Sequence, residues 1–254
     1  MGRRFAADSM MRRDVRDGQR VGPAAWTPAE LGSKLVLDLN SDLGITIGTG
    51  VSQWSDQSTY GNHMTQAVAA SQMAYVPSAL DGHAVLRADG VDDFLTRDAT
   101  FTGLAAGDKP YIYTVYDPLY ASGNYSGNVW TLDATGVEST SQIHELLHNA
   151  ANMTLRRSTT LIAVAEGGLT PRLVTARWEA ATFALDVNNV EIGSAAGVGL
   201  ATTPLYYRVG ARFDGALRGN YDYARILMVM APTALEHTLV IAYLKAQYPS
   251  LGLP

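Results

Sequence analysis

Short apolar runs, separated by clusters of turn-forming residues, constrain the fold of this chain more than any other feature. The runs are too short for core helices, and several alternate apolar with polar residues, which is the period of a half-buried strand. Gly, Asn, Asp, Ser and Pro fill the gaps between the runs. From residue 34 onward the pattern predicts strands over Lys34 to Leu39, Ala84 to Arg87, Tyr111 to Tyr116, Leu173 to Trp178, Phe183 to Val187 and Arg225 to Met230.

Two local patterns predict a hairpin and a helix. The alternation that begins at Phe183 stops at Asn188-Asn189 and then resumes. Asn tolerates positive φ, so a tight hairpin is expected there. Thr233 and Glu236 form a capping box at the start of one C-terminal helix. The apolar residues that recur at helical spacing, and that we expect on its packed side, are Leu235, Leu239, Ala242 and Tyr243.

The chain of 254 residues divides into a basic arm over residues 1–25 and one domain over residues 26–254. Residues 1–24 hold six Arg and three Asp, a net charge of +3, whereas the remainder holds 13 basic and 21 acidic residues, a net charge of −8. Because the arm has few large apolar residues, we expect it to be ordered only by a partner. The string Thr27-Pro28-Ala29-Glu30 is a second capping box and predicts a short turn where the domain begins.

Composition excludes several classes of protein. The chain has no Cys, which rules out disulfides and thiolate metal sites. No secretory signal and no run of ~18 apolar residues is visible, so we expect synthesis in the cytoplasm and no membrane insertion. Arginine side chains bind phosphate well, but Asp residues lower the net positive charge of the arm, and the rest of the chain is acidic. A protein is therefore expected as the partner of the arm rather than a nucleic acid. The arm residues expected to contact that partner are Arg3, Arg4, Phe5, Arg12, Arg13, Arg16 and Arg20.

Several strings resemble a known family. The string Trp26-Thr27-Pro28-Ala29 precedes the first expected strand, and the closing helix ends in Ala242-Tyr243-Leu244-Lys245-Ala246-Gln247-Tyr248. Together with the strings below, they resemble the LamG-like, concanavalin A-like lectin/glucanase domains of bacterial surface proteins and phage virion proteins. The other strings are Val51-Ser52-Gln53-Trp54-Ser55-Asp56-Gln57-Ser58, Gly61-Asn62-His63, Tyr75-Val76-Pro77, Asp89-Gly90-Val91-Asp92-Asp93-Phe94-Leu95 and Phe213-Asp214-Gly215.

The resemblance covers residues 26 to 250 and implies an all-β fold. Its form is a two-sheet antiparallel jelly-roll sandwich with a short C-terminal helix, which agrees with the strand pattern, here preceded by an extended N-terminal arm. This fold hosts lectins, glycosidases, adhesins and structural modules, so function must be argued from a site. Glucanases of the fold use two Glu that flank an Asp on one strand. No such string occurs here, which predicts that the chain is not an enzyme.

One string matches a zinc-peptidase pattern. His144-Glu145-Leu146-Leu147-His148 fits H-E-x-x-H, which requires a helix that brings both His to one metal. No third ligand follows at a known spacing, because Ala151 and Thr154 stand where the extended pattern needs Gly and His. In the resembling family this region is a strand, and a strand would separate the two His by ~13 Å. We therefore interpret the match as a coincidence and expect no metal there.

Two groups of residues remain as binding candidates. The loop Asp117 to Asn128 carries aromatic and amide side chains that could stack on and hydrogen-bond a sugar, namely Tyr120, Asn124, Tyr125 and Trp130. Hard oxygen ligands in a loop suit calcium, and some LamG-like domains bind it, so the calcium candidates are Asp89, Asp92 and Asp93. Both groups also fit purely structural roles: the aromatic residues as half-buried side chains at the edge of the sandwich, and the Asp residues as turn formers. Apart from possible calcium, no cofactor is expected.

Two functions follow as hypotheses. The first is a non-enzymatic structural protein of a bacteriophage virion, such as a capsid decoration, head-fibre or tail-associated protein. Its arm would bind other virion proteins, with multiple copies in one assembly, because repeated contacts offset the entropy of ordering the arm. The alternative is a carbohydrate-binding or adhesion module that recognises bacterial surface glycans. The first hypothesis places the chain in the virion, and the second is compatible with the same location.

Overall fold

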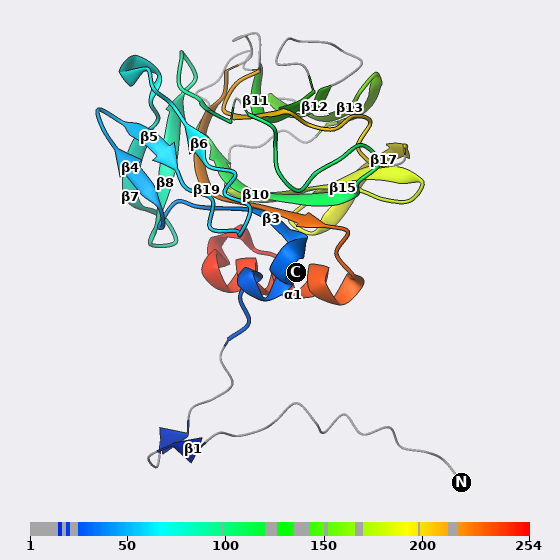
Figure 1. Cartoon of the computed structure of the whole chain (residues 1–254), viewed down its shortest axis with the longest axis horizontal. Coiled ribbons are helices and arrows are strands. Elements are labelled where there is room, and N and C mark those ends of the chain that lie inside the picture. Colours follow the sequence, from blue (N-terminus) through cyan, green and yellow to red (C-terminus); the bar gives the residue numbers. More distant parts are fainter. Residues whose placement is uncertain are drawn as a thin grey trace.

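The computed structural model describes residues 25–97, 99–119, 126–134, 143–149, 152–165, 170–197, 199–212 and 218–254. In the arm it describes only the paired strands β1 (Val15–Arg16) and β2 (Gln19–Arg20). The rest of the described chain forms two antiparallel sheets and one α-helix, arranged as three layers (Figure 1). The all-β sandwich that the strand pattern predicts is therefore confirmed. No helix in the described residues is long and apolar enough to cross a membrane.

The first sheet has eight strands. Its order is β17-β16-β15-β10-β19-β8-β7, and β3 also pairs with β19. All its pairs are antiparallel, and β19 pairs over part of its length with β8 and over another part with β3. The strands are β3 (Leu35–Asn40), β7 (Ala74–Leu80), β8 (His83–Asp89), β10 (Pro110–Pro118), β15 (Arg172–Trp178), β16 (Thr182–Val187), β17 (Val190–Ala196) and β19 (Asn220–Met230).

The second sheet has nine strands and lies across the first (Figure 1). Its order is β14-β13-β12-β11-β18-β9-β6-β5-β4, and it too is antiparallel throughout. The strands are β4 (Ile45–Ile47), β5 (Val51–Trp54), β6 (Met64–Thr65), β9 (Leu95–Arg97), β11 (Ser126–Asp133), β12 (Ile143–Asn149), β13 (Met153–Arg157), β14 (Thr160–Val164) and β18 (Tyr206–Val209).

The main core lies between the two sheets. Side chains alternate across each strand, so every second residue of both sheets points into this layer. Trp54, Trp130 and Trp178 are fully buried there. At roughly 25 cal/mol per Å², such large side chains contribute much of the apolar burial that stabilises the sandwich.

A smaller core lies on the outer face of the eight-stranded sheet. Helix α1 (Ala234–Gln247) and the 3₁₀ helices η1 (Pro28–Lys34) and η3 (Pro249–Leu251) cover that face (Figure 1). The remaining 3₁₀ turn is η2 (Ala69–Ser71). The predicted capping box of α1 is confirmed: Glu236 N donates to Thr233 Oγ1 at 3.2 Å, and Thr233 N donates to Glu236 Oε2 at 2.6 Å.

Two residues of the strings that resemble LamG-like domains, Asp56 and Asn62, form part of the scaffold. Asp56 follows β5, and its carboxylate accepts hydrogen bonds from the backbone N–H groups of Asp38, Ser58 and Asn62 at 2.8–2.9 Å. Asn62 Nδ2 donates to the carbonyls of Val36 and Thr102 at 3.0 and 2.9 Å. These two side chains therefore fix the loop between β5 and β6 of the nine-stranded sheet against β3 of the eight-stranded sheet.

Two further expectations have different outcomes. The Asn188-Asn189 hairpin is confirmed between β16 and β17, and both residues have positive φ, 48° and 64°. The apolar residues at helical spacing on α1 are only partly packed: Tyr243 contacts the core under the helix, whereas Leu235 is 68% exposed and Ala242 is also exposed. The helix is apolar on several sides, so spacing alone did not identify its buried residues, which are Val240, Ile241 and Leu244.

Candidate functional site

The H-E-x-x-H string lies on strand β12 and not on a helix. The strand interpretation is therefore confirmed. His144 and His148 are both directed into the core between the sheets, and each is 1% exposed. Four residues along a strand span ~13 Å, so the two imidazoles are too far apart to share one zinc ion.

Both imidazoles have structural partners. Nε2 of His144 accepts the N–H of Ala201 at 2.9 Å, and the ring stacks on Trp178 with centroids 5.8 Å apart. Burial, with a smaller contribution from Arg157, lowers the pKa of His144 to about 3. Nδ1 of His148 lies 3.2 Å from the hydroxyl of Tyr116. Both side chains thus act as core aromatics.

Glu145 points to the opposite side of β12, onto the outer face of the nine-stranded sheet. Its Oε1 lies 3.0 Å from Nη1 of Arg156, and its Oε2 accepts Nδ2 of Asn128 at 2.6 Å. The same Nδ2 donates to Oγ1 of Thr131 at 2.8 Å, and among the described residues Oδ1 of Asn128 has no partner. A carboxylate that is 1% exposed needs such partners, because burying an unpaired charge costs several kcal/mol, roughly 3–5 when one partner of a buried pair is removed.

One continuous line of paired residues runs over this outer face from β4 to β13 and ends next to Leu161 of β14. Glu145 pairs with Thr131 on one side and with Arg156 on the other, and Thr131 pairs in turn with Arg208. The adjacent line of residues faces the core and is apolar, with Leu146 opposite Trp130. We name the outward line the polar row; it consists of Thr46, Gln53, Thr65, Thr96, Arg208, Thr131, Glu145 and Arg156.

Exposure changes along the polar row. Thr46 and Thr65 near one end are exposed, whereas Thr131 and Glu145 at the centre are 0% and 1% exposed. Two arginines next to this buried centre keep accessible atoms. Arg156 has 23% of its side chain exposed.

Arg208 is the second of these arginines. Its guanidinium lies 4.5 Å from the ring centroid of Phe94, and its Nη1 donates to the carbonyl of Arg212 at 3.1 Å. Buried Glu145, held by Asn128, thus supports the guanidinium of Arg156, whereas that of Arg208 is held by Phe94 and the carbonyl of Arg212 on the same face of the sandwich. Guanidinium groups held in place in this way present planar sets of donors to hydroxyl or carboxylate oxygens.

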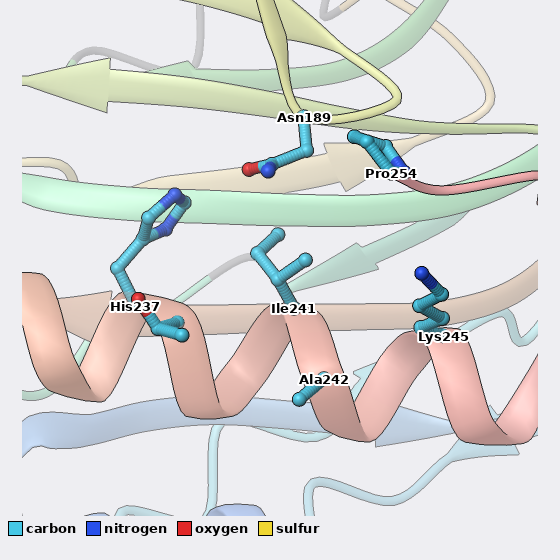
Figure 2. A pocket seen from close by; sticks show the side chains of 7 residues that line it. Asn189, His237, Ile241, Ala242, Lys245 and Pro254 are labelled. Atoms are coloured by element: carbon cyan, nitrogen blue, oxygen red, sulfur yellow. The ribbon is translucent and has the colours of Figure 1, made fainter.

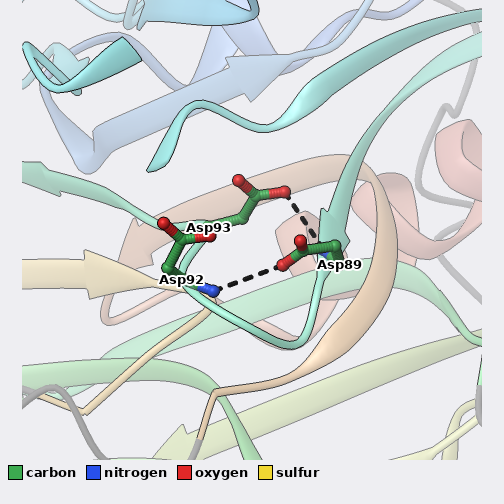
Figure 3. Close-up of side chains that lie close together, drawn as sticks. All are labelled: Asp89, Asp92 and Asp93. Atoms are coloured by element: carbon green, nitrogen blue, oxygen red, sulfur yellow. Dashed lines mark hydrogen bonds between the residues drawn. The ribbon is translucent and has the colours of Figure 1, made fainter. Parts of the chain in front are cut away.

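The three calcium candidates do lie close together, in the loop between β8 and β9 (Figure 3). One carboxylate oxygen from each of Asp89, Asp92 and Asp93 lies within 4.8 Å of the others. Burial, followed by the charge of Asp89, raises the pKa of Asp93 to about 6, and Asp92 adds to the same effect. Phe94, which follows this loop, touches Arg208, so the loop borders the polar row.

The loop partly satisfies its own carboxylates. Oδ1 of Asp89 accepts the N–H groups of Val91 and Asp92 at 2.7 and 3.3 Å, and Oδ2 of Asp93 accepts that of Asp89 at 3.1 Å. Hard oxygen donors suit calcium, which takes six to eight oxygen ligands. Three carboxylates could supply only part of that number, so backbone carbonyls and water would have to supply the remainder.

The predicted sugar-binding loop lies mostly outside the described residues. Tyr120, Asn124 and Tyr125 are not among them, and neither are Arg3, Arg4, Phe5, Arg12 and Arg13 of the arm. Arg16 and Arg20 lie in β1 and β2, of which only the backbone is described. Trp130 is described and is corrected: it is 0% exposed and packs near Trp178 in the core, so it has no face available for stacking on a sugar.

Sequence reasoning missed the polar row. The alternation along β12 shows that Glu145 lies opposite the two histidines, but it doesn't show which residues of other strands lie beside Glu145. Arg156 is 11 residues away in the sequence and Arg208 is 63 residues away, and only the register of the sheet brings them together. The one available signal was a carboxylate within a strand, a residue type that is rarely buried unless it is paired.

Comparison with known proteins identifies the fold. No family model matches the sequence, and no curated protein matches it. Among solved structures, a Trypanosoma rangeli sialidase is 10% identical, with a TM-score of 0.61 over 85% of this chain and 34% of its own. An arabinofuranosidase in complex with arabinofuranosyl-α-1,2-xylobiose is 12% identical, with a TM-score of 0.59 over 78% of this chain and 51% of its own.

A third similar structure is botulinum neurotoxin type C, described as interacting with two ganglioside molecules. It is 10% identical, with a TM-score of 0.57 over 87% of this chain and 53% of its own. The chain thus spans between a third and about half of the length of these three structures. At such low identity the likeness concerns the fold alone.

Proposed function

We propose that this chain is a non-enzymatic module that binds a glycan across the centre of the polar row. The observation that carries the proposal is a pair of partly accessible arginines on one face: Arg156 is held by buried Glu145, and Arg208, which pairs in register with buried Thr131, is held by Phe94. Sugars offer many hydroxyl oxygens, and donors held in place lower the entropy lost on binding them. The similar sandwiches of a ganglioside-binding toxin and two glycosidases support the same ligand class.

The same geometry supports binding without catalysis. Glycoside hydrolysis uses two carboxyl groups, one of which holds a proton while the other stays ionised. Glu145 is bonded to Arg156 and Asn128 beneath the accessible arginines, so its role in this proposal is to position Arg156.

A glycan array followed by calorimetry tests the proposal. The array should contain bacterial surface polysaccharides and animal glycans, and the best ligand is then titrated into purified variants. We expect Arg208→Gln and Arg156→Lys to weaken binding about tenfold or more, since each removes planar guanidinium contacts while Arg156→Lys keeps the ion pair with Glu145. Thr46→Val, at the exposed end of the same row, is the matched control and should bind as the wild type does.

Two results would contradict the proposal. One is an array on which no glycan binds above background. The other is a glycan whose affinity is the same for wild type and Arg208→Gln, because the ligand would then lie elsewhere on the molecule. Thermal unfolding of each variant separates loss of binding from loss of folding.

We further propose that the arm attaches the sandwich to a larger assembly, as in a phage virion protein present in many copies. The supporting observation is the segregation of charge, +3 over residues 1–24 against −8 over the rest. Limited proteolysis with mass spectrometry tests it. We expect rapid cleavage within residues 1–24 of the isolated chain and protection when the chain is part of its assembly. Protection in the isolated chain would mean that the arm belongs to the sandwich itself.

A further inference from the structure

A pocket of about 350 Å³ lies on the other side of the molecule, against helix α1 (Figure 2). Helix α1, the nearby Pro254 and the turn between β16 and β17, which is distant in the sequence, form it. It is separate from the polar row because α1 covers the eight-stranded sheet, whereas the polar row belongs to the nine-stranded one. Figure 2 shows the side chains of His237, Ile241 and Lys245 directed from one side of α1 toward Asn189 and Pro254.

His237 is fixed in orientation at one end of the pocket. Its Nδ1 lies 2.8 Å from the hydroxyl of Tyr113, and its ring stacks on that of Tyr113 and meets the edge of Tyr111. Burial is the largest cause that lowers the pKa of His237, so the imidazole is neutral at pH 7. No described residue bonds its Nε2, which leaves this nitrogen as the polar atom of the ring for a ligand.

The hairpin turn places a second polar group above the pocket. Asn188 holds the turn to β15, because its Oδ1 accepts the N–H of Leu173 at 2.9 Å and its own N–H donates to the carbonyl of Leu173 at 2.8 Å. Asn189, with φ 64°, then directs its amide into the space opposite His237 (Figure 2). The amide makes no hydrogen bond with the described part of the chain.

Lys245 supplies a positive charge at the other end. It is eight residues beyond His237 on the same side of α1, which is ~12 Å along the helix axis. It makes no ion pair with any described residue. Ile241 lies between the two and gives the middle of the pocket an apolar wall. The carboxylates nearest to His237 are already held, because Arg177 pairs with them at 2.5–2.6 Å.

We propose that this pocket binds a small organic anion of the size of a monosaccharide acid. Its carboxylate contacts Lys245, its hydroxyls contact Nε2 of His237 and the amide of Asn189, and its apolar ring face lies on Ile241. The volume is at the lower end of the range of small-molecule sites, which suits one sugar ring. This site goes beyond the glycan-binding face proposed above and doesn't depend on it.

Titration calorimetry with galacturonate as the probe tests the site, with galactose as the neutral comparison. We expect saturable binding of galacturonate and at least tenfold weaker binding of galactose. Lys245→Met should weaken galacturonate binding tenfold or more. Asn189→Gly, which keeps a residue that tolerates positive φ in the turn, should weaken it several-fold without a change in thermal unfolding.

Two control variants locate the binding. Lys109→Met removes a lysine outside the pocket and should bind galacturonate as the wild type does, and Arg208→Gln distinguishes the pocket from the polar row. The proposal is overturned if galacturonate doesn't bind, if galactose binds equally well, or if Lys245→Met has no effect. Loss of binding in Arg208→Gln would assign the anion to the polar row and would also overturn it.

Discussion

At the scale of single residues, burial decides the role of each ionisable group. Asp93 is the clearest example outside the core. Burial and the neighbouring Asp89 and Asp92 raise its pKa to about 6, above the ordinary value of an aspartate. The folded state therefore binds a proton more tightly than the unfolded state does, and this group's contribution to stability is lost as the pH rises through about 6.

The pH dependence of Asp93→Asn tests this assignment. The variant removes the charge but keeps the shape, so it should gain stability over the wild type as the pH rises from about 4 to about 6 and keep that gain above pH 6. Urea unfolding from pH 4 to pH 8, with a chelator present, measures the difference. Equal pH profiles for the two proteins would show that the carboxyl group of Asp93 is not perturbed.

The same residue tests the calcium candidates. If Asp89, Asp92 and Asp93 hold calcium, millimolar Ca²⁺ should raise the thermal unfolding temperature of the wild type, because a ligand that binds only the folded state stabilises it. The increase should be absent from Asp93→Asn. Magnesium at the same concentration is the matched control, since it requires a more regular octahedral set of ligands. An equal response to calcium in both proteins would exclude this loop.

His144 gives a second test at this scale. Burial lowers its pKa to about 3, and its Nε2 accepts a backbone N–H, so the ring should stay neutral down to pH 4. Imidazole ¹⁵N chemical shifts measured by NMR between pH 8 and pH 4 report this directly. A titration near pH 6.5 would show that the ring is open to water, in conflict with its place beside Trp178.

At the scale of elements, the loop after β5 gives a structural role to the string Ser55-Asp56-Gln57-Ser58, one of those that resemble LamG-like domains. One carboxylate, that of Asp56, accepts three backbone N–H groups and also the hydroxyl of Ser58 at 2.7 Å. These bonds tie the loop to β3, because Asp38 belongs to that strand. The Asp-x-Ser spacing thus has a structural explanation that needs no ligand.

Asp56→Asn should therefore destabilise the protein by about 3 kcal/mol, since an amide replaces one accepting oxygen with a donor and leaves buried N–H groups without partners. Chemical unfolding monitored by tryptophan fluorescence measures the loss. Asp81→Asn is the matched control, because the carboxylate of Asp81 also accepts backbone and hydroxyl donors but lies at the surface. A loss no larger than that of the control would contradict the role assigned to Asp56.

The sequence predicted the positions of strands and of the helix better than it predicted which side of each element is buried. Alternation and turn residues identified the major strands, and paired Asn residues identified the hairpin, because these signals are local. Helix α1 was found from its capping box, but its buried side was not, since Leu235 is apolar and yet exposed. Trp130 was assigned to the surface for the same reason: a residue beside a loop gives no local sign of the sheet face to which it points.

At the scale of the whole molecule, the candidate sites depend on sheet register. The polar row joins residues from β12, β13 and β18, and the pocket joins α1 to the β16–β17 turn and to Pro254. Such long-range pairings are set by the packing of two sheets and are not encoded in any one segment. The fold class could therefore be predicted from the sequence, whereas the residues that share a site could not.

The central claim is that a glycan lies on the outer face of the nine-stranded sheet. An amide NMR titration of ¹⁵N-labelled protein with the glycan selected by the array tests it most directly. The account predicts that the largest shifts occur at Thr131, Glu145, Arg156 and Arg208. Shifts confined to α1 and the Asn188-Asn189 turn, with the polar row unchanged, would contradict it.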